Sequence, residues 1–303
     1  MNEQPQSGAM GGNEVHKKAS VFLTALSAVA ALVGLAAGHA RADTLDDIRA
    51  RGKLEVGVGI MGLKPIIWQN PDGTYSGYEY DMLQYILQKI GVKDFEYVNT
   101  EWTTLLPGLK SNRWDLVFSG VAITQERATG GDAKFTRPYF MYLDYVIVPK
   151  SSTYQNLADL KGKTAASVLG TMDSLTAHNL ADKGAFDQVK DFNTFGEPFV
   201  ALRNGQVDAV VIDQTTLKGQ QDTMGDLRVL AGPYFYEPKP ELKSAEDKAP
   251  YKLGAVGIAV RSNDERLLAA LNGAIADMYA DGTNEKILKK YGVWDPALAN
   301  PLK

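Results

Sequence analysis

The sequence predicts an α/β protein with two similar lobes that face each other across a cleft. The first indication is an internal echo, in which residues 109–120 align with residues 202–213 at a constant offset of 93. In both stretches an amphipathic helix ends in a turn, at Asn112 or Gly205, and an aspartate then opens a short apolar strand. The second indication is that strand and helix patterns alternate along most of the chain, which favours mostly parallel sheets.

The positions just beyond these two strands are candidate cleft positions, because open α/β sheets bind ligands at the carboxyl ends of their strands. They hold Ser119 and Gly120 in one copy and Asp213 in the other. The echo also has a plain interpretation. Any helix-to-strand unit shares this pattern, and only Leu, Asp and Val are identical between the two copies.

The first lobe is expected to begin with a short helix and a strand. The turn signal at Asn70–Gly73, between two short extended stretches, predicts a hairpin-like excursion. Gly91 then ends a long helix, as glycine commonly does at helix C-termini. The expected elements are helix Thr44–Arg51, strand Lys53–Val58, helix Glu79–Ile90, strand Phe95–Val98, helix Thr103–Lys110 and strand Asp115–Phe118.

The second lobe is expected to repeat the alternation. Its predicted elements are strand Thr164–Val168, helix Thr171–Lys183, strand Val189–Phe192, helix Pro198–Asn204, strand Ala209–Ile212 and a helix from Thr215.

The chain is expected to cross between the lobes twice, which predicts a two-stranded hinge. Tyr142–Pro149 leads out of the first lobe and Leu227–Ala231 is the return strand. Tyr234–Tyr251 is polar and proline-rich and is predicted to be a loop. Strand Gly254–Val260 and helices Asp264–Ala280 and Asn284–Tyr291 then complete the first lobe. These crossings place the first lobe at residues 43–143 and 232–303, and the second at 144–231.

Residues 1–42 are predicted to be a secretory signal peptide. Lys17 and Lys18 precede an apolar run that ends at Ala37, and Ala40-Arg41-Ala42 follows as a cleavage motif. Export to the periplasm with cleavage before Asp43 is therefore expected. The alternative is an uncleaved membrane anchor, because the run is nearly long enough to span a bilayer.

Composition excludes several classes of function. The chain has 303 residues, of which 45% are hydrophobic and 22% charged, so it can bury a sizeable core. Removing the leader moves its formal net charge from −4 to −5, which argues against nucleic acid or anionic membrane as a partner. Cysteine is absent, so thiol chemistry is excluded. Only His178 remains after the leader, which excludes a histidine-rich metal site; no metal or cofactor is expected.

Two motifs in the chain resemble functional sites but do not predict them. Gly57–Gly62 matches a dinucleotide fingerprint, yet Lys64-Pro65 follows where that motif needs a helix. Ser174 and His178 share a helical face, but no strained nucleophile turn precedes the serine. A polar helix surface is the simpler interpretation of this pair.

Several segments together carry a family resemblance over nearly all of the mature chain. They are Gly77–Met82, Ser119–Arg127, Phe135–Phe140, Leu160–Lys163, Gly170-Thr171 and Ala280–Gly292. The chain resembles the periplasmic solute-binding proteins for polar amino acids, which serve ABC importers. The resemblance implies the two-lobed periplasmic-binding-protein fold, an amino acid or close derivative as ligand, a membrane ABC permease as partner, a monomer, and no catalysis.

The resemblance also implies two charged contacts to the ligand. Arg127, in the Thr-x-x-Arg motif that begins at Thr124, corresponds to the arginine that grips the α-carboxylate, and a guanidinium offers the two parallel donors for this. Asp213 corresponds to the acid that pairs with the α-ammonium. An isolated arginine is more often a solvated surface charge, and Asp213 could instead cap the helix that follows it. The capping and binding roles of Asp213 are compatible.

Further contacts follow from the same resemblance. Trp102 is expected against the ligand side chain, although a core tryptophan is the competing interpretation. The Gly120 carbonyl, next to Ser119, would accept from the ammonium. Thr171 would offer its hydroxyl and amide to the carboxylate.

The chain departs from the family pattern where the ligand side chain would lie. Ala122 replaces a hydroxyl residue, Ile60 and Leu63 replace an acid and an aromatic of basic-amino-acid binders, and Met172 replaces a small or polar residue. These changes predict a neutral, partly apolar ligand side chain, although Asp173 could reach a cationic substituent.

The alternative function is an enzyme on the same fold, because the resemblance extends to cyclohexadienyl dehydratases. Such an enzyme needs an additional acid in the cleft as proton donor, and the sequence alone identifies none.

Overall fold

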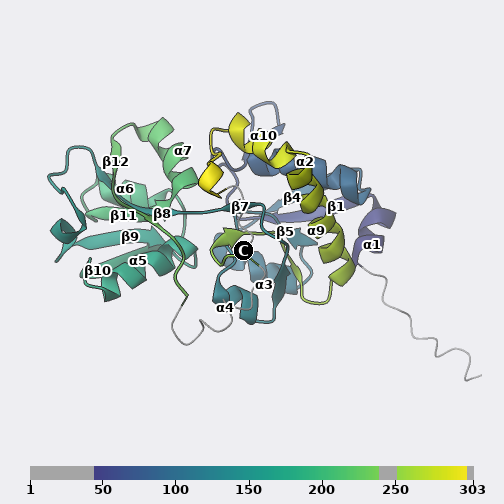
Figure 1. Cartoon of the computed structure of the whole chain (residues 1–303), viewed down its shortest axis with the longest axis horizontal. Coiled ribbons are helices and arrows are strands. Elements are labelled where there is room, and N and C mark those ends of the chain that lie inside the picture. Colours follow the sequence, from purple (N-terminus) through teal and green to yellow (C-terminus); the bar gives the residue numbers. More distant parts are fainter. Residues whose placement is uncertain (1–43, 239–250, 299–303) are drawn as a thin grey trace, which may run out of the picture. The chain divides into compact units, whose positions relative to one another are not determined.

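The computed structural model describes residues 44–238 and 251–298. The predicted signal peptide and most of the predicted loop Tyr234–Tyr251 lie outside these residues. The described chain forms two five-stranded sheets that are flanked by helices (Figure 1). None of the described helices is both long and apolar enough to cross a membrane. The helices are α1 (Thr44–Arg51), α2 (Tyr78–Ile90), α3 (Leu105–Lys110), α4 (Gln125–Thr129), α5 (Met172–Asp182), α6 (Glu197–Arg203), α7 (Gln214–Met224), α9 (Glu265–Ala280) and α10 (Thr283–Lys290).

The first sheet, called sheet 1 below, has the strand order β4-β1-β5-β14-β6. β1 is parallel to β4 and β5, whereas β14 is antiparallel to both of its neighbours. One strand therefore runs against the other four. The strands are β1 (Lys53–Val58), β4 (Asp94–Asn99), β5 (Leu116–Val117), β6 (Ala133–Phe135) and β14 (Ala259–Arg261). The predicted hairpin is also present, as the antiparallel pair β2 (Trp68–Gln69) and β3 (Tyr75–Ser76).

The second sheet, sheet 2, repeats this arrangement with the order β10-β9-β11-β8-β12. β9 is parallel to β10 and β11, and β8 is antiparallel to both of its neighbours. The strands are β8 (Asp144–Pro149), β9 (Thr164–Val168), β10 (Gln188–Phe192), β11 (Ala209–Asp213) and β12 (Leu227–Tyr234).

The internal echo of the sequence corresponds to the same central unit in each sheet, α3–β5 in one and α6–β11 in the other. The turns before the strands have left-handed backbones, with φ 56° at Asn112 and φ +67° at Gly205. Asp115 accepts the amide of Glu55 at 2.8 Å, and the equivalent Asp208 accepts the amide of Thr164 at 3.0 Å. The repeated aspartate thus ties the start of the central strand to the strand beside it.

Both faces of the central strand β11 are buried, as expected for a strand that is covered by helices on both sides. In β11, Val210 and Ile212 pack in one apolar cluster with Phe199 and Leu202 of α6. The alternate residues Ala209 and Val211 pack in another cluster with Ala177 and Leu180 of α5. Figure 1 shows α5 and α6 on opposite sides of this sheet.

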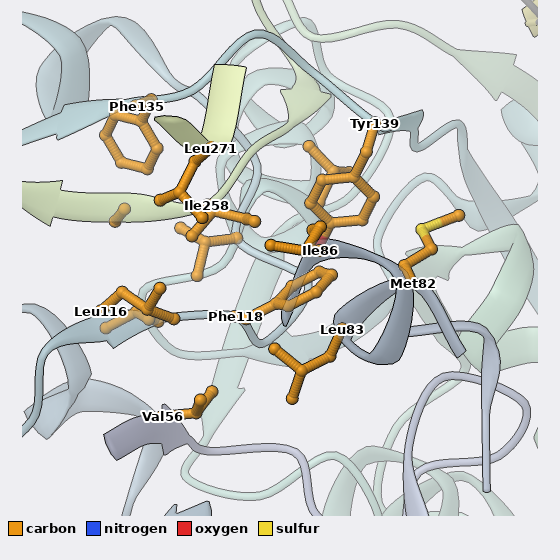
Figure 2. Packing of buried hydrophobic residues seen from close by; sticks show 14 of the residues in the cluster. Val56, Met82, Leu83, Ile86, Leu116, Phe118, Phe135, Tyr139, Ile258 and Leu271 are labelled. Carbon is orange, nitrogen blue, oxygen red and sulfur yellow. The ribbon is translucent and has the colours of Figure 1, made fainter. Parts of the chain in front are cut away.

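The core of sheet 1 forms where α2 and α9 pack against its strands. Figure 2 shows part of this core, in which side chains of the two helices meet those of the strands. Among its labelled residues are Val56, Met82, Leu83, Ile86, Leu116, Phe118 and Leu271, all at most 2% exposed.

The predicted strand Gly254–Val260 is wrong in one respect, because it is two strands with different partners. β13 (Ala255–Val256) pairs with β7 (Phe140–Met141), and β14 joins sheet 1. The break falls at Gly257, where a Cβ would lie 2.9 Å from the Ile123 side chain and 3.2 Å from the Thr136 carbonyl oxygen. This close approach needs glycine and redirects the chain from one pairing to the other.

The chain connects the sheets twice, in agreement with the predicted hinge. It leaves β7 and enters β8 through Tyr142 and Leu143, and it returns after β12 to re-enter at β13. Gln214 at the start of α7 contacts the first crossing from sheet 2. Its side-chain oxygen accepts the Leu143 amide at 2.7 Å, and its side-chain nitrogen donates to the Met141 carbonyl at 2.9 Å.

Packing around Trp114 gives a stability prediction for two helical glycines. A Cβ on Gly108 in α3 would lie 2.1 Å from the buried Trp114 ring, whereas a Cβ on Gly273 in α9 would meet no atom within 4 Å. We expect Gly108→Ala to lower the free energy of unfolding by about 1–3 kcal/mol through overpacking. The control Gly273→Ala should raise it by about 0.5–1 kcal/mol through helix propensity. Denaturant unfolding measures both, and a stabilised Gly108→Ala variant would contradict the packing.

Candidate functional site

A cavity lies between sheet 1 and sheet 2, and it leaves about 20 Å³ for the centres of water molecules. The nine residues predicted from the sequence all line it: Leu63, Trp102, Ser119, Gly120, Ala122, Arg127, Thr171, Met172 and Asp213. Six further residues complete the lining: Ile60, Ile66, Tyr142, Asp173, Phe195 and Thr216.

Arg127 is the cation of the cavity, and a short helix positions it. The Thr124 hydroxyl caps α4 by accepting the Arg127 amide at 3.4 Å, which gives the Thr-x-x-Arg motif its spacing. The half-buried guanidinium donates to the Ala122 carbonyl at 2.6 Å and to the Gly170 carbonyl at 2.7 Å. Arginine has five N–H donors, so others remain for a further acceptor.

Trp102 supports the guanidinium from the side. Its ring centroid lies 5.7 Å from the Arg127 guanidinium carbon, within cation–π range. Its indole nitrogen donates to the same Gly170 carbonyl at 3.2 Å. Burial lowers the pKa of Arg127 to about 10, with the nearby Asp173 opposing the shift, so the guanidinium stays protonated at neutral pH.

The end of β5 is held against its surroundings by hydrogen bonds. The Ser119 hydroxyl accepts the Gly59 amide at 2.9 Å, which joins the ends of β5 and β1. Gly120 adopts φ +62°, and its amide donates at 2.7 Å to the buried Glu79 carboxylate. These hydrogen bonds fix the backbone of Ser119 and Gly120, which lines the cavity.

Asp213 is the buried acid at the end of β11, and it is also the N-cap of α7. One carboxylate oxygen, Oδ1, accepts the amides of Thr215 and Thr216 at 2.8 and 3.0 Å, together with the Thr215 hydroxyl. The predicted capping role is therefore present, and the side chain lies at the cavity as well. The Thr216 hydroxyl is buried and has no hydrogen-bond partner among the described residues.

Thr171 lies at the cavity, but its donors are engaged differently from the expectation. Its hydroxyl donates to the Val168 carbonyl at 2.7 Å, and its amide donates to the same oxygen at 3.2 Å. The hydroxyl oxygen also accepts the Ser174 amide at 3.1 Å, which makes Thr171 the N-cap of α5. Its hydroxyl is thus committed to the helix start.

Asp173 brings a second buried acid to the cavity, next to Asp144 in β8. Burial raises the pKa of Asp173 well above its usual value, and the charges of Asp144 and Asp213 raise it further. Burial raises the pKa of Asp144 to about 6, against the hydrogen bonds from Asp173 and Thr176 that lower it. Both shifts favour the protonated form of these carboxyl groups, compared with an aspartic acid in water.

The remaining lining is largely apolar, and part of it was missed in the sequence. Phe195 follows the carboxyl end of β10 and stacks edge-on against Trp102, with ring centroids 5.5 Å apart. The rule that points to Ser119 and Asp213 would also have pointed to it. Tyr142, in the crossing, donates to or accepts from Tyr78 at 3.1 Å. No pattern in the sequence distinguishes Tyr142 from an ordinary strand residue.

Ser174 and His178 do not form a catalytic pair. Ser174 donates to one carboxylate oxygen of Asp191 at 2.7 Å, and the His178 ring contacts the other at 2.8 Å. The serine hydroxyl is thus bonded to the acid and not to the imidazole. In the described part of the chain no group of three or more His, Asp or Glu side chains could hold a metal ion.

Two α/β units of the same topology, joined by two crossings and enclosing a cavity with a cation and an acid in its lining, define the class of periplasmic binding proteins. Residues 56–293 match the model of the bacterial extracellular solute-binding proteins, family 3, and the chain belongs to this family. The predicted fold and family are thereby confirmed.

Relatives that are named for different ligands are similar in sequence to this chain. The ABC transporter arginine-binding protein 1 of Escherichia coli (strain K12) is 31% identical over 216 residues, which cover 70% of this chain and 79% of that protein. The ABC transporter glutamine-binding protein GlnH of Bacillus subtilis (strain 168) is 28% identical over 271 residues, covering 87% of this chain and 90% of that protein.

The solved structure of a reconstructed ancestral protein is also similar to this chain. It is an ancestral amino acid-binding protein described as a precursor of cyclohexadienyl dehydratase. Its TM-score is 0.66 at 27% identity, and the match covers 82% of this chain and 99% of that chain. The name describes that ancestor as a binding protein, so this likeness does not favour an enzyme.

The two roles of Asp213 can be separated by stability measurements. Asn caps helices as well as Asp does, so we expect Asp213→Asn to unfold at the same denaturant concentration as the wild type or a higher one. Asp213→Ala should lose about 1 kcal/mol, the usual value of an N-cap. Equal losses in both variants would show that the cap is not what Asp213 contributes to stability.

Proposed function

We propose that the protein captures an α-amino acid, or a close derivative, with a neutral and partly apolar side chain. The two lobes close on this ligand and the closed form delivers it to a membrane ABC permease. Membership of an extracellular solute-binding family supports a location outside the cytoplasm, and the predicted signal peptide agrees with it.

One observation carries the proposal. The same cavity contains a cation from the sheet 1 side, Arg127, and a buried acid from the sheet 2 side, Asp213. A zwitterion has one charge for each, and both can be satisfied only when the lobes lie together. The unpaired hydroxyl of Thr216 adds a polar group that a ligand could use.

The lining supports a neutral ligand side chain. Ile60, Leu63, Met172 and Phe195 supply apolar surface, and burial and neighbouring charges favour the protonated form of the nearest extra acid, Asp173. A protonated carboxyl is a poor partner for a guanidinium or ammonium group. The ligand specificity therefore need not follow that of the relative named for arginine.

Titration calorimetry against the twenty common L-amino acids tests the proposal. Neutral side chains should give the tightest binding, and tight binding of arginine or glutamate alone would refute the pocket assignment. Arg127→Ala should weaken binding of the best ligand by about 2–5 kcal/mol, which raises Kd on the order of 30-fold to several thousand-fold.

Two variants act as controls for this measurement. Arg127→Lys keeps the charge but not the parallel donors, so an intermediate loss is expected. Arg203→Ala removes an exposed arginine in the last turn of α6 and should leave Kd unchanged. An Arg127→Ala variant with wild-type affinity would remove this residue from the site.

A second candidate function is a cyclohexadienyl or arogenate dehydratase, which Asp173 favours. This buried carboxyl lies at the cavity, and its raised pKa favours the protonated form, which is the proton donor that the alternative requires. In such a reaction the ring hydroxyl would leave as water with that proton while the ring carboxylate leaves as CO2.

Purified protein incubated with arogenate or prephenate distinguishes the two functions. The proposed binding function predicts no phenylalanine or phenylpyruvate above the uncatalysed rate, because the ligand is released unchanged. Product formation that disappears in Asp173→Asn would instead establish the dehydratase.

A further inference from the structure

Glu79 is a buried carboxyl group directly behind the candidate site. It is the second residue of α2 and is 1% exposed. Its oxygen Oε1 accepts the Gly120 amide at 2.7 Å and the Tyr139 hydroxyl. Its other oxygen, Oε2, is buried and has no hydrogen-bond partner among the described residues. Glu79 therefore contacts the site only through the backbone of Gly120.

The Gly120 peptide is a position where small changes of backbone matter. Gly120 lines the cavity at φ +62°, and a Cβ there would lie 2.6 Å from the Tyr142 hydroxyl. Because the peptide is planar and trans, fixing its N–H on Glu79 also fixes the direction of the Ser119 carbonyl, which points the opposite way. One hydrogen bond thus sets the orientation of the backbone that faces the cavity.

In the described part of the chain, no cation is among the groups that shift the pKa of Glu79. The titratable groups that face it are four buried tyrosines, whose own pKa values are raised so that they stay neutral. They are Tyr78, Tyr97, Tyr139 and Tyr142. Burial raises the pKa of Glu79 to about 7, while the hydrogen bonds from Tyr139 and Gly120 oppose that shift. The group therefore titrates in the neutral range.

The two charge states of Glu79 differ in how they hold Gly120. A carboxylate accepts an N–H more strongly than a neutral carboxyl does, because charge-assisted hydrogen bonds are about twice as strong as neutral ones. A carboxylate also polarises the Ser119–Gly120 peptide that it holds. This strengthens the Ser119 carbonyl as an acceptor for a ligand ammonium.

We propose that Glu79 is a positioning residue for the ligand site, and that its ionised carboxylate holds the Gly120 peptide in the orientation that the bound amino acid needs. Uptake of a proton by Glu79 loosens this peptide and lowers ligand affinity. The inference rests on the proposed function, because it requires the amino acid to contact the Gly120 segment.

Ligand affinity should fall as the pH is lowered, because the ionised form of Glu79 is the one that holds the site for binding. Apparent affinity scales with the ionised fraction, which is nearly complete at pH 8 and falls as the pH drops through the pKa of Glu79. With a pKa of about 7, apparent Kd should rise about tenfold between pH 8 and pH 6. The α-groups of a free amino acid do not titrate in this interval.

Calorimetric titration of the full-length mature protein with L-leucine, L-methionine and L-glutamine from pH 6 to pH 8.5 tests the inference. In Glu79→Gln, which keeps an acceptor but not the charge, affinity at pH 8 should fall at least to the wild-type value at pH 6 and should vary less with pH than in the wild type. The pair Asp144 and Asp173 is unchanged in this variant, so its contribution to the pH profile remains. Tyr139→Phe removes a hydrogen bond that lowers the pKa of Glu79, so the midpoint of the pH profile should move upward. This shift is a readout that loss of packing would not produce.

His178 is the control, because it is a histidine outside the cavity lining and its ring is bonded to Asp191. His178→Gln should keep the wild-type profile. A Glu79→Gln variant with the wild-type affinity and slope, an unmoved midpoint in Tyr139→Phe, or a slope lost in His178→Gln would overturn the role of Glu79 alone. A wild-type protein that binds none of the twenty common L-amino acids at any pH would overturn the proposed function, and the inference with it.

Discussion

The structure of the site depends on one half-buried guanidinium, whose hydrogen bonds go to groups from both sheets. Arg127 extends from the sheet 1 side and donates to Ala122 there and to Gly170 on the sheet 2 side, where Trp102 also donates. A cation removed from water needs such partners. In the proposed function, a ligand carboxylate takes up the remaining N–H donors of the same guanidinium. Ligand binding and contact between the sheets then depend on one side chain, which links recognition to closure.

On the opposite wall of the cavity, hydrogen bonds hold the Asp213 carboxylate in position. Asp213 uses one oxygen for three donors at the start of α7, which fixes the carboxylate without a cation. Burial raises the pKa values of Asp144 and Asp173 close by, which favours their neutral forms and opposes further negative charge on this wall. On the other side, Glu79 supports the Gly120 backbone from inside the core. Each charged group that lines or supports the cavity is thus held by a structural bond as well.

The sequence predicted most helices and strands to within a few residues, because their signals are local. Helix stops such as Gly91, the turn at Asn70–Gly73 and the repeated aspartates act within a few positions of the chain. The strand break at Gly257 was not predictable, since it arises from contact with Ile123 and Thr136, which are distant in sequence. The nine candidate site residues could be predicted because both the ends of the strands and the family motifs identify the same edge of each sheet. Tyr142, Thr216 and Glu79 were missed, since their importance depends on burial and on partners that only the folded chain brings together.

The central claim is that one small molecule is held by its two opposite charges, one on each side of the cavity. The most direct measurement compares, by calorimetry, the best-binding L-amino acid with its decarboxylated amine and with its deaminated acid. Each analogue keeps the side chain and lacks one charge. The account predicts that both lose on the order of a hundredfold or more in affinity, as expected when a buried charge is left unpaired. An analogue that binds as tightly as the parent amino acid would contradict it.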